Sequence, residues 1–238
     1  MRRFHRYLIL PILAVAFTAA ACGGDAGPSK ANAASSTATP AATAEPAKIN
    51  ITTQSINEDA DRYTIRVSYP QTGLATADAQ IKKIIDANVA QIKDATKDGS
   101  KGPPPVSAAG KYTLDGSFTT ILAGPDIVSI NLSISTYTGG AHGAHAIFGL
   151  NFDKTGKALS LDDALRMTSL TLTQLSDQVT QQLKAKLGRD FLFPEGATAD
   201  PKNFNTFLIS ADKVTFVFQE YQVAPYVAGI QQISVPVK

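Results

Sequence analysis

The chain has 238 residues, of which 44% are hydrophobic, and a formal net charge of +2. Three of its 22 basic residues lie in an apolar leader, so the chain without that leader has 19 basic and 20 acidic residues, a net charge of −1. Charges of both signs in near balance argue against nucleic-acid binding, which selects for clustered Lys and Arg. A single cysteine allows no intrachain disulfide, so the fold must depend on a hydrophobic core.

Residues 1–21 have the three parts of a signal peptide: a basic start, an apolar stretch and small residues before Cys22. The apolar stretch is shorter than the roughly 20 residues of a spanning helix. Small residues that end at a cysteine resemble the lipobox of bacterial lipoproteins, which implies removal of the leader and attachment of acyl chains such as palmitate at Cys22. We therefore expect a lipid-anchored protein of the bacterial cell envelope, facing the periplasm or the exterior, at the outer membrane if the envelope has two membranes. Ordinary cleavage nearby, with a free thiol left over, is the alternative.

The segment behind the cysteine is almost entirely Ala, Gly, Ser, Thr and Pro. Such a segment has no large apolar side chains to bury. We therefore predict that residues 22–47 comprise the lipidated cysteine and a disordered linker, and that the folded part begins near Lys48.

The N-terminal half of the folded part shows two periodicities. Apolar residues alternate with polar ones over 63–69, which predicts a half-buried strand that stops at Pro70. Apolar residues at three- and four-residue steps predict a helix over about 76–96, and the proline-rich run 97–105 predicts a loop. Strict alternation over 128–135 predicts a strand with one face on a core and a polar face open to solvent or a partner.

The C-terminal half begins with another alternating strand, over 148–152, and a turn. Ser160 is expected to cap a short helix that ends near Leu165. A longer helix is expected over 172–187, with Gly188 placed to terminate it. Three closing strands are predicted over 207–209, 214–218 and 233–237. The class is therefore α+β, a mainly antiparallel sheet with two main helices, in two small halves packed as one unit.

Several short strings occur in an order typical of one pair of bacterial domains. They are Tyr137-Thr138-Gly139-Gly140-Ala141-His142, Asn151-Phe152-Asp153, Thr155-Gly156-Lys157, Leu161-Asp162-Asp163, Phe218-Gln219-Glu220-Tyr221 and Val235-Pro236. The chain resembles the paired domains of unknown function DUF4163, over 48–145, and DUF3298, over 146–238.

The resemblance implies a binding or sensing role at the cell envelope. The paired domains form the extracytoplasmic part of the anti-sigma factor RsiV, which binds lysozyme, and DUF4163-like regions also occur beside polysaccharide deacetylase domains that act on peptidoglycan. We expect this chain to lack the sigma-binding segment and the deacetylase domain with its Asp/His metal set. The expected ligand is a lysozyme-like protein or peptidoglycan.

Metal binding by the two histidines outside the leader, His142 and His145, is the first chemical alternative. A zinc site needs three or four ligands, and carboxylates such as Asp126 or Asp153 would have to complete the set. Rings three residues apart in an extended segment also tend to face opposite sides. We expect instead no metal and no cofactor, with glycines supplying unusual backbone angles and a local hydrogen bond on His142.

Ligand binding is expected at the glycine-rich run and at a C-terminal cluster of aromatic residues and proline. The candidate ligand-binding residues are Tyr137, Gly139, Gly140, His142, His145 and Tyr226. For the cluster of Tyr221, Pro225 and Tyr226, a buried corner is the alternative to a binding surface. No residue is assigned a catalytic role, because no nucleophile motif is present. A cell-wall hydrolase or deacetylase that uses His142 with nearby carboxylates remains the second hypothesis.

Overall fold

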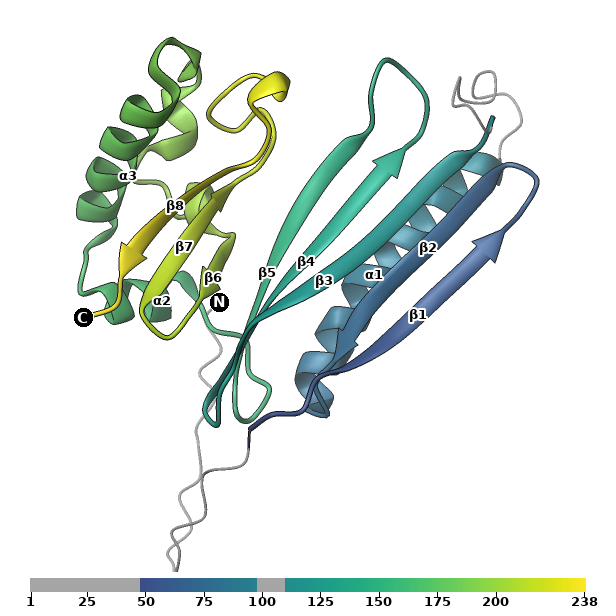
Figure 1. Ribbon diagram of the computed structural model, residues 1–238, viewed down its shortest axis with the longest axis horizontal. Helices are drawn as coiled ribbons and strands as arrows, with labels where there is room; N and C mark the ends of the chain where they lie inside the picture. Colours follow the sequence, from purple (N-terminus) through teal and green to yellow (C-terminus); the bar gives the residue numbers. More distant parts are fainter. Residues whose placement is uncertain (1–47, 98–109) are drawn as a thin grey trace, which may run out of the picture. The chain divides into compact units, whose positions relative to one another are not determined.

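The computed structural model describes residues 48–97 and 110–238. The predicted signal peptide, Cys22, the linker and nearly all of the predicted loop 97–105 lie outside these residues. The described chain has eight strands and three α-helices in mostly antiparallel sheets, which confirms the α+β class (Figure 1). Within this part of the chain, no helix is long and apolar enough to cross a membrane.

The first sheet has five strands in the order β1-β2-β3-β4-β5. Their bounds are β1 Thr52–Asp59, β2 Tyr63–Gln71, β3 Tyr112–Ala123, β4 Ile127–Tyr137 and β5 Ala144–Asp153. Neighbouring strands are antiparallel except β2 and β3, which pair in parallel. A parallel pair requires a crossover connection, and the helix α1, Ala75–Lys97, lies in that connection.

Helix α1 covers one face of this sheet. Its buried side chains include Ile81, Ile85 and Ile92, which pack with inward-facing residues of β2, β3 and β4. The predicted helix over 76–96 is therefore confirmed. The predicted end of the preceding strand at Pro70 is wrong by one residue, because β2 continues to Gln71. Pro70 lies opposite Thr53 of β1 and beyond Val67, the last residue of β2 that pairs with β3, so β2 is itself an edge there and a missing N–H is tolerated.

The second sheet has three antiparallel strands, β6 Phe207–Ile209, β7 Lys213–Phe218 and β8 Gln231–Pro236. All three were predicted. Two helices precede them, α2 Leu161–Thr168 and α3 Leu172–Leu187. Side chains on one face of α3 are buried against the same core as Phe216 and Phe218 of β7. The four short 3-10 turns are η1 Gly188–Asp190, η2 Pro194–Ala197, η3 Pro201–Phe204 and η4 Tyr226–Ala228.

Both helices of this half begin with a capping box. Ser160 and Thr171 each accept a hydrogen bond from the third residue of the following helix, and that residue's side chain accepts one from the cap backbone in return. The predicted cap at Ser160 is confirmed, although α2 runs three residues past Leu165. Gly188 is the C-cap of α3, as predicted.

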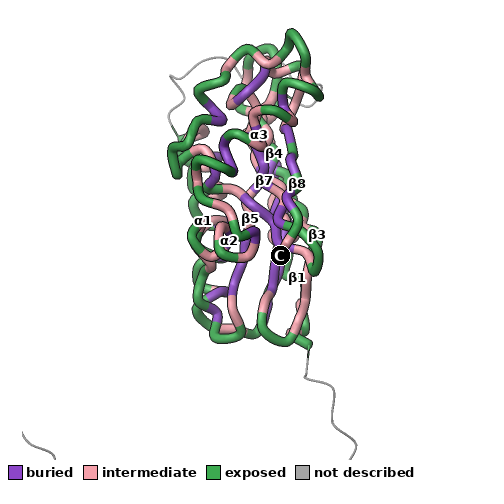
Figure 2. Tube along the Cα trace, turned by 90° about the vertical axis from the view of Figure 1, so that its left-hand side faces the viewer, coloured by how far each residue is buried: buried purple, intermediate pink, exposed green. Residues whose placement is uncertain are grey.

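The two sheets meet along β5. Ile147 of β5 packs with Leu208 and Val217 in a third small buried cluster, on the face of the second sheet opposite its α3 core. Buried residues accordingly follow the strands of both halves (Figure 2). The expected junction between the halves, at 145/146, falls after the second residue of β5, a strand that pairs with β4 throughout its length.

The polar face predicted for β4 is only partly open. Ser129 is fully buried, and its hydroxyl is satisfied inside the protein: it accepts a hydrogen bond from the backbone N–H of Ile209 in β6 at 2.9 Å and donates one to Asn151 Oδ1 at 2.7 Å. The prediction of an exposed face is therefore wrong at Ser129. Further along the strand, Ser133 is half-buried and Ser135 is exposed.

Candidate functional site

Two connections far apart in the sequence meet at one end of the sheets. They are the β4–β5 loop, residues 138–143, and the β7–β8 connection, residues 219–230, both at the upper ends of their strands in Figure 1. The ring of His142 stacks on that of Tyr226, with centroids 3.8 Å apart and planes at 21°. The Tyr226 hydroxyl donates to the carbonyl of Gly143 at 3.2 Å. With Tyr221, these two rings form what we call the aromatic cluster: His142, Tyr221 and Tyr226.

The β4–β5 loop depends on its glycines. Gly139 and Gly140 have φ of 97° and 98°, in the region that L side chains rarely adopt. At Gly143 a Cβ would lie 2.8 Å from the Thr136 carbonyl oxygen, so a side chain there would collide with backbone. The hydroxyl of Tyr137 donates to the Gly140 carbonyl at 3.0 Å. The expected unusual backbone angles of this run are thus present.

The ring of His142 is held at both nitrogens. Nδ1 lies 2.8 Å from the carbonyl oxygen of Gly143, and because a carbonyl only accepts, Nδ1 carries the proton. Nε2 lies 3.4 Å from the Tyr221 hydroxyl, which is the donor when the imidazole is neutral. The expected local hydrogen bond of His142 is therefore found, together with a long-range partner that the sequence did not indicate.

Tyr221 occupies a strained position in a tight turn. The backbone N–H of Gln222 donates to the Gln219 carbonyl at 3.0 Å, which makes Tyr221 the third residue of a four-residue turn. Its φ is 64°, a value that this turn position normally reserves for glycine. The side chain is 54% exposed, so burial of the ring contributes little to offset the strain. Strain of this kind often occurs at functional sites.

The side chains of the same turn fasten it to the edge of β5. The amide of Gln219 accepts from the N–H of Ile147 at 3.1 Å and donates to its carbonyl at 2.8 Å. Glu220 Oε2 accepts from the N–H of His145 at 3.2 Å. These side chains satisfy edge groups that a neighbouring strand would otherwise pair with. The turn that carries Tyr221 is therefore fixed beside the loop that carries His142.

His145 lies apart from the aromatic cluster. Its Nε2 is 2.6 Å from the hydroxyl of Ser133 on β4, whereas His142 stacks on Tyr226. Among the described residues, no group of three or more His, Cys, Asp or Glu side chains is placed to hold a metal ion. Of the candidate residues, the structure thus brings His142 and Tyr226 together, while Tyr137 contacts Gly140 within the loop that also holds Gly139.

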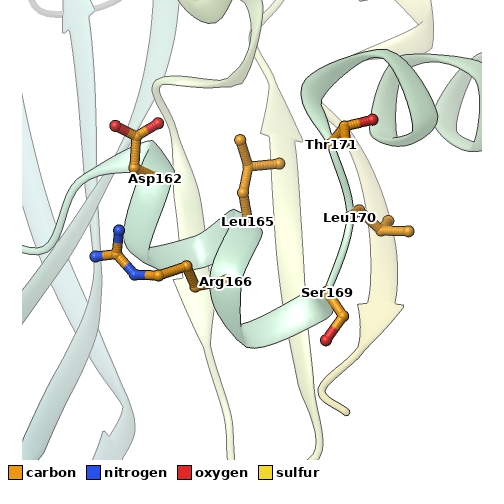
Figure 3. A pocket seen from close by; sticks show the side chains of 6 residues that line it. All are labelled: Asp162, Leu165, Arg166, Ser169, Leu170 and Thr171. Carbon is orange, nitrogen blue, oxygen red and sulfur yellow. The ribbon is translucent and has the colours of Figure 1, made fainter.

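A separate open depression lies where α2 meets the start of α3, with a volume of about 400 Å³. Asp162 and Arg166 lie on one side of Leu165, and Ser169 to Thr171 on the other (Figure 3). The guanidinium of Arg166 is already paired with Asp163. None of the candidate residues lines this depression, and we assign it no role.

The fold defines an α+β module of two sheets with an aromatic cluster where two of their connections meet; His142 and Tyr221 are exposed and Tyr226 is half-buried. Two family models match it. The model described as "Protein of unknown function (DUF3298)" matches residues 163–238, and the model described as "Deacetylase PdaC" matches residues 56–145. The expected DUF3298 domain is therefore confirmed.

A relative and two crystal structures are similar to this chain. The chain is 26% identical over 190 residues to the peptidoglycan-N-acetylmuramic acid deacetylase PdaC of Bacillus subtilis, covering 78% of this chain. It spans only 40% of the length of that relative. Crystal structures of DUF3298 family members from Bacteroides fragilis and Pseudomonas aeruginosa share the fold, each with a TM-score of 0.53. They are 20% and 15% identical, cover 81% and 80% of this chain, and are themselves covered over 91% and 92%.

These comparisons cover the two matched segments of the chain, and three expectations from the sequence remain predictions. The DUF4163 pairing, the likeness to RsiV and the lipoprotein leader remain inferences from the sequence. Tyr221 was expected in the C-terminal cluster but is not among the candidate ligand-binding residues, and Glu220 was not expected at the site. A tyrosine at a turn position that favours glycine cannot be recognised before the turn itself is known.

Proposed function

We propose that the protein is a non-enzymatic, peptidoglycan-binding module of the bacterial cell envelope. The observation that carries the proposal is the aromatic cluster, because it is held in place by hydrogen bonds from two connections while one ring, Tyr221, stays 54% exposed. Val227, next to Tyr226 in η4, is 92% exposed. The Bacillus subtilis relative is a peptidoglycan-N-acetylmuramic acid deacetylase, which supports this choice of ligand over a lysozyme-like protein.

The chemistry of the cluster suits a sugar polymer. Tyrosine offers a large apolar face and a polar tip at low cost in side-chain entropy. The C–H groups on the face of a hexose pack on such rings, while its hydroxyls bond to polar groups at the rim. The hydroxyl of Tyr221, on a 54% exposed residue, and that of Tyr226, which donates to Gly143 and can still accept, supply those polar groups.

We place this module at a membrane through lipid on Cys22, with residues 23–47 as the tether. Two or three acyl chains hold a protein firmly to a bilayer, whereas one chain binds marginally. Labelled palmitate should enter the full-length chain in cells and should be absent from the Cys22→Ser variant. Equal labelling of both chains would refute the anchor at Cys22.

Sedimentation with purified peptidoglycan sacculi tests the binding role. The full-length chain in detergent should sediment with sacculi, and Tyr226→Ala should raise the apparent dissociation constant at least about tenfold, the equivalent of roughly 1.4 kcal/mol. Ile121→Ala, which changes a 36% exposed side chain of β3, serves as the control and should bind normally. No sedimentation by the unmodified chain, or retention by immobilised lysozyme alone, would refute the proposal.

A cell-wall deacetylase or hydrolase is the second candidate, favoured by the similarity to a deacetylase and by the family model described as "Deacetylase PdaC". The contacts of His142 speak against it as a general base. Its Nε2, the nitrogen that could take up a proton, already accepts from the Tyr221 hydroxyl at 3.4 Å, and Glu220 accepts from the N–H of His145 instead of orienting the imidazole. We expect no mass change in peptidoglycan fragments after incubation. A loss of acetyl groups that disappears in His142→Ala would favour the enzyme instead.

A further inference from the structure

We infer that the aromatic cluster binds two consecutive sugars of the glycan chain, and that it does not bind the stem peptides of peptidoglycan. This inference rests on the proposed function and goes one step beyond it, from the polymer to the part of the polymer that the site recognises. Three features of the cluster support the inference: the arrangement of its rings, the contacts that hold them and the charge beside them.

The three centroid distances place Tyr221 beside the stacked pair. They are 3.8 Å for His142–Tyr226, 5.7 Å for Tyr221–Tyr226 and 6.5 Å for His142–Tyr221. If Tyr221 lay on the free face of Tyr226, its distance to His142 would be close to the sum of the other two. The observed value is much smaller, so neither of the other two rings covers that second face of Tyr226.

Tyr221 and Tyr226 therefore form two neighbouring, gently inclined rings, with planes at 33°. Their separation is close to the length of one hexose unit in an extended β-1,4-linked chain. Two such rings match two successive sugars of one chain, each ring packing against one sugar face. A single sugar would use only half of this platform, which we define as the rings of Tyr221 and Tyr226.

Both rings of the platform are positioned before any ligand arrives. The hydroxyl of Tyr226 is bonded to Gly143, and its ring rests on His142. The turn around Tyr221 is fastened to β5 through Gln219 and Glu220. Groups ordered in advance lose less conformational entropy on binding, so a rigid platform favours a repeating rigid ligand.

The charge beside the platform favours sugars over stem peptides. The carboxylate of Glu220 directly precedes Tyr221 in the turn and points to the edge of β5. Stem peptides carry free carboxylates, which would meet a like charge there. The hydroxyl and acetamido groups of N-acetylated sugars are neutral and can donate hydrogen bonds to a carboxylate or to the backbone carbonyls of the loop.

Calorimetric titration of the full-length chain in detergent tests the inference. The probes are N-acetylglucosamine, its β-1,4-linked dimer and tetramer, and a synthetic stem peptide. We expect the dimer to bind at least about tenfold more tightly than the monomer, the equivalent of about 1.4 kcal/mol, and the stem peptide not to bind. Tyr221→Gly should remove the gain of the dimer over the monomer, whereas Ile121→Ala should keep it.

The outcomes separate the inference from the proposed function. Suppose that the chain binds sacculi but also binds the stem peptide, or binds sacculi but none of the sugar oligomers. Either result would overturn the inference and leave the proposed function standing. An undiminished gain for the dimer in Tyr221→Gly would also overturn it. No binding to sacculi at all would overturn the proposed function itself.

Discussion

At the scale of single residues, Tyr221 is the position where folding and the proposed binding role make opposite demands. A non-glycine residue in the left-handed region costs about 1–2 kcal/mol. Its φ of 64° and 54% exposure mean that the protein carries this cost for a side chain that adds little to the core. A strained, exposed aromatic residue fixed beside a stacked pair is what a preformed binding surface would require.

Replacing Tyr221 should separate these two demands. Tyr221→Gly relieves the strain, so its free energy of unfolding should be equal to or up to about 1 kcal/mol above that of the unmodified chain. Tyr221→Ala loses the same ring but keeps the strain, so it should be less stable than the glycine variant by about 1 kcal/mol. Urea unfolding followed by circular dichroism measures the difference. An alanine variant as stable as the glycine variant would show that φ at this position is not strained.

The sequence allowed part of this site to be predicted. His142 and its glycines stand out because a run with so many glycines indicates backbone angles that other residues avoid. The partner of His142 does not stand out, since Tyr221 lies 79 positions further along the chain. What joins them is the docking of Gln219 and Glu220 on β5, and nothing local in either segment records that contact.

At the scale of elements, helices were easier to predict than strands. Helix α1 has a clear apolar stripe, whereas β1 has the sequence TTQSINED and is mostly exposed, so it offers almost no hydrophobic alternation. Strand β3 does alternate, but Gly116 interrupts the pattern. A Cβ at Gly116 would lie 2.7 Å from Cγ1 of Val67, its partner on the parallel neighbour β2. Gly116 therefore interrupts the alternation by which β3 could be predicted, and its missing side chain leaves room for Val67 of the neighbouring strand.

The cap of α2 should contribute a stability that depends on pH. The hydroxyl of Ser160, and then its backbone N–H, donate to the carboxylate of Asp163 and lower its pKa below the usual 3.8. Because the pKa is depressed in the folded state, the stabilisation is fully present above the unfolded-state pKa and is lost as the pH falls through the folded-state pKa. Asp163→Ala should cost about 1 kcal/mol at neutral pH, and the difference should shrink below about pH 4.

The matched control for this prediction is Asp162→Ala, in the same first turn of α2. Asp162 also lies near the positive end of the helix dipole, but it makes no capping bond. It should cost less than Asp163→Ala, by an amount that thermal unfolding between pH 3 and pH 7 can resolve. Equal losses for the two variants at neutral pH would mean that the helix dipole, and not the capping box, accounts for the effect.

At the scale of the whole described unit, the two sheets are joined through β5. Asn151 of this strand donates to the Phe207 carbonyl at 2.8 Å, and Ser129 of β4 accepts from Ile209. Ile147 contributes both an apolar contact and its backbone bonds to Gln219. The same strand leads directly out of the loop that carries His142. The junction of the sheets and the geometry of the aromatic cluster therefore depend on the same segment.

Gly149 is the position at which this dependence can be tested. A Cβ there would lie 2.0 Å from the Phe207 carbonyl oxygen, so Gly149→Ala must push β6 away from β5. We expect the free energy of unfolding to fall by about 3 kcal/mol or more, because backbone atoms cannot rotate out of the way as a side chain can.

Gly124→Ala is the matched control, since its Cβ would make only an ordinary contact at 3.4 Å with Ile127. Hydrogen exchange followed by mass spectrometry should show faster exchange in Gly149→Ala at 144–153 and 207–209, with the β3–β4 pair less affected. If the two variants had the same stability and the same protection from exchange, the close approach of β5 and β6 at Gly149 would not hold the sheets together. The aromatic cluster would then not depend on that approach.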